Sequence, residues 1–186
     1  MARRVILAGL MGWVVLMLWT FVTNGIFGFR SGIAMKRVPE ERLVYDVLRK
    51  SILEPGGYVC NPAVTAERGF PFGEPVFAIR YGGVGHEAAG RLALIGLAIG
   101  LAAPLIGAWM LSVASDRFLS SYGRKVLFFA AIGLLFAIFA DLQEYGIGGY
   151  PLRSALLLGA HDLAAWMLAG LVVAWRIRPA RAEANR

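Results

Sequence analysis

The chain has 186 residues, of which 58% are hydrophobic and 17% are charged, and its formal net charge is +7. Soluble domains are only about half apolar, and the mean hydropathy here is +0.63, so the composition excludes an ordinary soluble protein. The positive charge does not indicate nucleic-acid binding, because the basic residues are scattered at loop ends without a recognition motif. The single cysteine, Cys60, excludes a disulfide within the chain.

Four apolar blocks follow one another along the chain, at residues 5–23, 92–115, 126–140 and 155–175. A membrane-spanning helix needs about 20 residues, and the third block reaches that length only by including part of 141–145. We therefore predict an all-α membrane protein with four transmembrane helices in a single domain, 1–186. The first block is too long for an ordinary signal peptide and no A-x-A site follows it, so we expect this helix to be retained.

Basic residues predict the orientation of these helices. If the N-terminus is cytoplasmic, the cytoplasmic side holds nearly all the lysines and arginines of the short loops and chain ends: Arg3, Arg4, Arg117, Arg124, Lys125, Arg176, Arg178, Arg181 and Arg186. The opposite short turn holds only Arg153. We predict cytoplasmic N- and C-termini in a bacterial inner membrane, an extracytoplasmic loop at 25–88, and a basic cytoplasmic tail at 176–186.

The long loop contains an amphipathic helix near 39–53, which Pro39 would start and Pro55 would end. Its apolar face consists of Leu43, Val44, Val47, Leu48 and Ile52. A solvated helix needs no such face, so we expect it to lie on a partner, on the bundle or on the membrane surface. Strand-like pieces at 58–60 and 76–81 allow a small hairpin. Cys60 is either a free thiol or a disulfide partner for another subunit.

A glycine-rich stretch leads into the second apolar block. Gly82, Gly83 and Gly85 precede a helix N-terminus, where backbone N–H groups are able to hold a lipid phosphate or another anion, with His86 as a further donor. The alternative is a flexible turn without a ligand. The spacing does not match a dinucleotide-binding fingerprint.

Small residues recur along the apolar blocks at spacings of three and four. In the second block the line is Ala89, Ala93, Gly96, Gly100, Ala103 and Gly107; in the third it includes Gly133 and Ala137; in the fourth it includes Gly159. Helices in lipid associate by close backbone approach, which small residues allow. We therefore predict that these lines are helix-packing faces.

The stretch "LLLGAHDLAA" places His161 and Asp162 within the last apolar block. At roughly 1.5 Å per residue, Asp162 lies about 9 Å and Asp141 roughly 6 Å below the same membrane surface, so the two acids are able to meet. Thr20 reaches a similar level, and Glu144 continues the face of Asp141. Adjacent side chains leave a helix about 100° apart, so we expect Asp162 to face the packing seam and His161 to lie beside it. These five residues form the predicted intramembrane polar site.

An ionisable group in hydrocarbon costs a few kcal/mol, which makes this site a functional hypothesis. One interpretation is a proton relay or ion site, for which imidazole is suited. A metal site has suitable ligand types but no E-x-x-H or H-x-x-x-H spacing. Haem ligation would need His86 and His161, the only histidines, at matching depths. The structural alternative is a hydrogen-bonded contact that sets helix register, within the chain or against another subunit.

Motifs for catalysis are absent from the sequence, which has no G-x-S-x-G, H-E-x-x-H or phosphate loop. A lipid-directed enzyme using His86, Glu87 and His161 is the enzymatic alternative, and no cofactor or metal is indicated. The favoured prediction is an integral membrane subunit or accessory protein of a larger assembly, in contact with lipid and with other subunits or copies. The alternative is a small proton, ion or solute carrier with a site at Asp141, His161 and Asp162.

Overall fold

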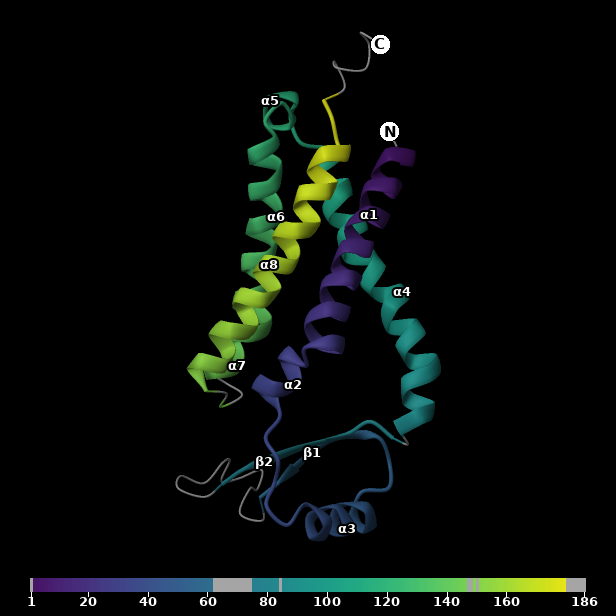
Figure 1. The fold of residues 1–186 in the computed structure, drawn as a ribbon, viewed down its shortest axis with the longest axis vertical. Coiled ribbons are helices and arrows are strands. Elements are labelled where there is room, and N and C mark those ends of the chain that lie inside the picture. Colours follow the sequence, from purple (N-terminus) through teal and green to yellow (C-terminus); the bar gives the residue numbers. More distant parts are fainter. Residues whose placement is uncertain (1, 62–74, 84, 147–148, 150, 180–186) are drawn as a thin grey trace, which may run out of the picture. The chain divides into compact units, whose positions relative to one another are not determined.

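A computed structural model describes residues 2–61, 75–83, 85–146, 149 and 151–179, without the side chains of 85–89, 91–93 and 146. The chain divides into two compact units. Unit 1 contains Met1–Lys36 and Leu97–Arg186, and unit 2 contains Arg37–Gly96. The fold is mostly helical, and Figure 1 labels its elements.

Unit 1 is built from helices that the apolar blocks of the sequence form. They are α1 (Ala2–Thr20), η1 (Phe21–Ile26), α2 (Phe29–Ala34), the greater part of α4 (Gly85–Ser112), α5 (Asp116–Leu119), α6 (Tyr122–Phe136), η2 (Ala137–Leu142), α7 (Gln143–Gly146) and α8 (Leu152–Arg176). The segments η1 and η2 are π-helical and continue α1 and α6 without a break.

Four helical stretches are long and apolar enough to cross a membrane: Ala2–Ile26, Leu94–Ser112, Tyr122–Tyr145 and Leu152–Arg176. They coincide with the four blocks expected from hydropathy, so this part of the prediction is confirmed. The start of α1 and the end of α8 lie at the same end of unit 1, beside α5 (Figure 1), as an even number of spans requires. Which side of the membrane that end faces remains a prediction.

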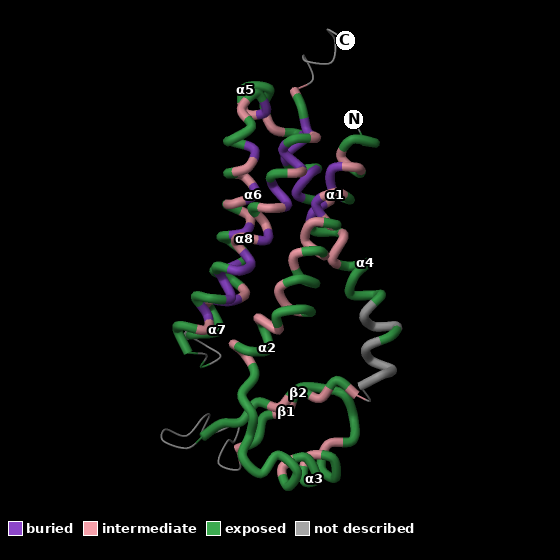
Figure 2. The backbone as a smooth tube through the Cα atoms, viewed as in Figure 1, coloured by how far each residue is buried: buried purple, intermediate pink, exposed green. Residues whose placement is uncertain are grey.

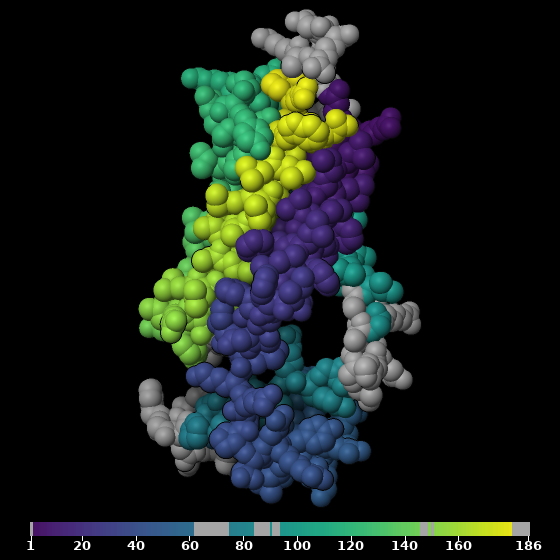
Figure 3. All heavy atoms as spheres, in the orientation of Figure 1, coloured from purple at the N-terminus to yellow at the C-terminus, as the bar shows by residue number. Residues whose placement is uncertain are grey.

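Helix α8 forms the centre of unit 1, with α6 and α1 packed against it (Figure 3). The buried backbone in Figure 2 follows α8 and the parts of its neighbours that face it. Close approach depends on glycine: a Cβ added at Gly133 would lie 3.3 Å from Leu163 Cα, and one at Gly159 would lie 3.4 Å from Ala137 Cβ. The small residues predicted on α6 and α8 therefore lie in a real helix interface.

Helix α4 packs through a different face from the one its small residues suggested. Among the described side chains of α4, the buried ones are Pro104, Gly107, Ala108, Leu111 and Ser112, which overlap the predicted line only at Gly107. Gly96 and Ala103 are exposed, and Gly100 is half-buried, with Trp13 Nε1 3.9 Å from a Cβ added there. The side chain of Ala93 lies outside the described residues.

Glycines of α1, rather than those of α4, make room where these two helices meet. A Cβ added at Gly9 would lie 2.8 Å from Leu105 Cα, and one at Gly12 would lie 3.4 Å from Pro104 Cβ. The indole of Trp13 adds a hydrogen bond to the carbonyl of Leu97, at 3.1 Å. Whether another helix packs on the small-residue line of α4 stays a prediction.

Unit 2 contains α3 (Glu41–Ser51) and an antiparallel hairpin of β1 (Gly56–Cys60) and β2 (Phe77–Tyr81), with Tyr58 opposite Ile79. The hairpin appears where two strand-like pieces were expected, so the fold is not purely α-helical. Helix α3 begins two residues after Pro39, because Glu40 takes a left-handed conformation with φ of 57°. Among the described residues of unit 2 none is fully buried, and Cys60 is an exposed free thiol.

Candidate functional site

Five polar side chains from four elements of unit 1 meet where α1 passes into α2. We call Thr23, Arg30, Asp141, His161 and Asp162 the ionic cluster. His161 and Asp162 lie in the third turn of α8, Asp141 lies in η2, Thr23 lies in η1 and Arg30 lies in α2.

The two π-helical segments bring their side chains to α8. A π turn holds one more residue than an α turn, so it changes the direction of every side chain that follows it. Thr23 and Asp141 both lie within such segments, on opposite sides of α8. π-Helical turns in proteins are frequently found at functional sites, and here both of them contribute to one cluster.

Arg30 binds the two acids. Its Nη2 donates to Asp162 Oδ2 at 2.7 Å and lies 3.6 Å from Asp141 Oδ1. The carboxylates are buried, with 8% of Asp162 and 7% of Asp141 exposed, whereas 47% of the Arg30 side chain is exposed. One guanidinium thus contacts two buried acids from the open side of the cluster and neutralises the charge of one of them.

The backbone of α2 is shaped to present Arg30. Gly28 precedes the helix with φ of +60°, a left-handed conformation that glycine adopts without strain. The backbone N–H of Arg30 donates to Asn24 Oδ1 at 3.2 Å, and the Ser31 hydroxyl donates to the Gly28 carbonyl at 2.9 Å. The chain is therefore held by local hydrogen bonds as it turns from η1 into α2.

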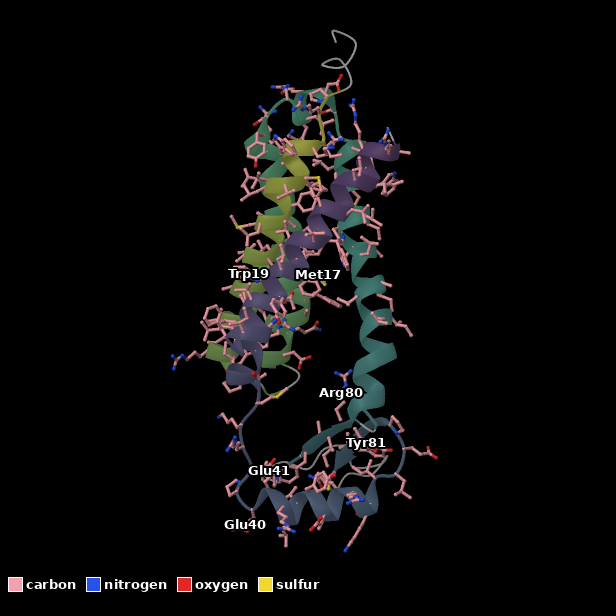
Figure 4. All side chains as sticks on the ribbon, turned by 45° about the vertical axis from the view of Figure 1, so that its right-hand side comes forward. Met17, Trp19, Glu40, Glu41, Arg80 and Tyr81 are labelled. Carbon is pink, nitrogen blue, oxygen red and sulfur yellow. The ribbon has the colours of Figure 1, made fainter. Side chains whose placement is uncertain are left out.

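His161 is buried and held at both ring nitrogens. Nδ1 lies 2.7 Å from Asp162 Oδ1, and Nε2 lies 2.9 Å from Thr23 Oγ1. The ring stacks on Phe29 at a centroid distance of 5.1 Å and lies 5.4 Å from the Trp19 ring. Figure 4 labels Trp19 on α1. We expected His161 to lie beside the seam that Asp162 faces; instead, the two neighbouring side chains contact each other directly.

Two buried polar atoms near the ionic cluster have no hydrogen-bond partner among the described residues: Asp141 Oδ2 and Trp19 Nε1. A buried carboxylate oxygen without a donor costs about 1–3 kcal/mol or more, so Asp141 is the least satisfied member of the cluster. This imbalance distinguishes the cluster from a fully paired structural salt bridge.

Of the predicted polar site, the structure brings Asp141, His161 and Asp162 together. Thr20 and Glu144 are exposed and take no part. Thr23 takes the position expected of Thr20, because η1 changes the direction of the residues that follow Thr20. Arg30 was missed because it was counted within the outer loop, although the apolar neighbours in "IFGFRSG" are unusual for a solvated loop.

The glycine stretch before α4 contains a left-handed residue in its described part. Gly83 has φ of +90°, and a Cβ added at Gly82 would meet nothing within 4 Å. Gly85 is the first residue of α4, and the side chain of His86 lies outside the described residues. The predicted anion site therefore stays a prediction.

Within the described part of the chain, no three His, Cys, Asp or Glu residues are grouped so that they could hold a metal ion. The ionic cluster has a single histidine and two acids that are already engaged by a guanidinium, which suits proton and hydrogen-bond chemistry better than metal ligation. Comparison of the chain with protein-family models, with curated proteins and with solved structures finds no match.

Proposed function

We propose that the chain is an integral membrane subunit of a larger assembly. Two surfaces of the described residues support this proposal: the small-residue face of α4 and the apolar faces of unit 2. The ionic cluster then serves to fix the register of α2, α6 and α8 inside the subunit.

The small-residue face of α4 supports a helical partner. Gly96 and Ala103 share one side of the helix, and a Cβ added at Gly96 would meet nothing within 4 Å. Lipid chains gain little from glycine and alanine, whereas a second helix gains close backbone contact. Gly100 on the same face lies against Trp13, so a partner helix would approach most closely at Gly96 and Ala103.

The exposed apolar side chains of unit 2 support an extramembrane partner. On α3, 68% of Leu43 and 57% of Val47 are exposed. A cavity of about 630 Å³ lies between α3 and the hairpin, walled by Leu48, Ile52 and Ile79 and flanked by Arg49 and Arg80. Arg80 is labelled on the hairpin in Figure 4. Apolar surface with a basic rim is typical of a protein-binding surface.

Purification in mild detergent tests this proposal with a matched pair of variants. Ala103→Leu adds bulk to the small-residue face, and Ala102→Leu adds the same bulk at a neighbouring exposed position about 100° away. We expect stoichiometric partners to copurify with the natural chain and with Ala102→Leu, and to be lost from Ala103→Leu. A chain that migrates alone in all three cases would refute the proposal.

A second candidate function is favoured by the ionic cluster itself: a small carrier of protons, ions or solutes. Buried acids beneath a half-exposed arginine are typical of membrane sites that bind or release charge. In vesicles, we expect a proton or solute flux that Asp162→Asn abolishes while the helix content and detergent stability remain. If Asp162→Asn instead disrupts a copurifying assembly, and no flux is found, the carrier proposal fails and the subunit proposal is supported.

A further inference from the structure

The protonation of His161 follows from the hydrogen bonds around Thr23. The Thr23 hydroxyl carries one hydrogen, yet its oxygen lies 2.7 Å from the Trp19 carbonyl and 2.9 Å from His161 Nε2. A carbonyl oxygen has no hydrogen to give, so the hydroxyl donates to Trp19. The contact with Nε2 then needs a hydrogen on the nitrogen, and Thr23 Oγ1 accepts it.

The second ring nitrogen also needs a hydrogen. Nδ1 and Asp162 Oδ1 lie 2.7 Å apart, a distance at which two lone pairs would repel each other. The other carboxylate oxygen, Asp162 Oδ2, already accepts from Arg30. With Nε2 protonated, one additional proton must lie between Nδ1 and Oδ1, so the pair holds one proton more than a neutral imidazole and a carboxylate.

The charges of the cluster agree with this additional proton. Among the described residues, the charged groups that face the pair are Arg30 from α2 and Asp141 from η2, while α1 and η1 contribute the neutral Trp19 and Thr23. One guanidinium and two carboxylates leave a net charge of −1. The shared proton brings the total to zero, which is the state that a buried, low-dielectric site favours.

We propose that the ionic cluster is a proton-binding site, in which His161 and Asp162 share one proton beyond those of a neutral imidazole and a carboxylate. The proposal names the ligand of the second candidate function and rests on the same residues, but it requires no flux. A subunit that transports nothing would bind the proton equally well. The half-exposed guanidinium of Arg30 marks the side from which the proton exchanges with water.

Nitrogen NMR of histidine tests the proposal directly, because the chain has only two histidines. With ring-¹⁵N histidine and the His86→Gln substitution, the signal comes from His161 alone. We expect both ring nitrogens of His161 to carry hydrogen at neutral pH. A ring protonated only at Nδ1 at neutral pH would overturn the proposal.

Variants separate the partners of the proton. Asp162→Asn and Thr23→Val should each reduce the fraction of doubly protonated His161 at neutral pH, whereas Asp46→Asn on the exposed α3 should leave it unchanged. If His86→Gln does not fold, comparison of the natural chain with Asp162→Asn identifies the signals of His161 as those that change. Equal NMR behaviour of all three variants would refute the shared proton.

Discussion

Gly133→Ala is the sharpest test of how α6 approaches α8. A Cβ at this position would lie 2.7 Å from Trp166 Cβ and 3.3 Å from the Cα and carbonyl oxygen of Leu163. Carbon atoms in ordinary contact are about 3.5–4.0 Å apart, so α8 would have to move by about 1 Å. The two Leu163 atoms belong to the backbone, so they cannot move out of the way by a change of rotamer as a flexible side chain could. Overpacking of this kind costs about 1–3 kcal/mol, or roughly a 5- to 150-fold larger unfolding constant.

Gly123→Ala in the same helix is the matched control, because a Cβ there would meet nothing within 4 Å. Alanine is the better helix former, so this variant should be as stable as the natural chain or more stable by up to about 1 kcal/mol. Unfolding by SDS in mixed micelles, followed by tryptophan fluorescence, measures both. If the two variants differ by less than about 0.5 kcal/mol, the described approach of α6 to α8 is wrong.

Three further predictions use contacts elsewhere in the chain. Gly28→Ala should destabilise the bundle by about 1 kcal/mol in the same SDS assay, because φ is +60° there, whereas Gly32→Ala in open space should not. Trp13→Phe removes an interhelical hydrogen bond and should lower the free energy of unfolding by about 0.6 kcal/mol, whereas Trp109→Phe at an exposed position should not lower it. Equal losses of stability in the two variants would refute the contribution of that hydrogen bond. An impermeant maleimide should label the exposed Cys60 on intact cells, and labelling only after lysis would reverse the predicted orientation.

Long apolar blocks carry a strong signal, so the four spans could be predicted from the sequence alone. A hydropathy pattern depends on about 20 residues at a time, and errors of a few residues do not change it. The hairpin was also predictable, because two short β-forming pieces flank a stretch rich in proline and glycine. That Asp141 and Asp162 lie close together could be expected from the rise per residue of a helix and from the antiparallel arrangement of the last two spans.

Side-chain direction could not be predicted where the helical repeat changes. Thr23 replaces Thr20 in the cluster because η1 is π-helical, and no pattern in the sequence marks that change. Arg30 was missed because a charged residue after a span is ordinarily a loop residue, and only tertiary contact shows that α2 lies against the acids. On α4, the small residues do share one face of the helix. The sequence alone does not tell whether a helix of this chain or a helix of a partner packs on that face.

The two π-helical segments make the ionic cluster sensitive to the length of the chain as well as to its composition. Deleting one residue from Phe21–Ile26 would let the segment close into ordinary α-helix, with every polar and apolar residue type of the cluster still present. Every residue after the deletion would be rotated by about 100° about the helix axis. Thr23 would then no longer contact His161, and Arg30 would no longer reach the acids. The additional residue of η1 therefore determines which side chains reach the ionic cluster, at the cost of one regular helical hydrogen bond.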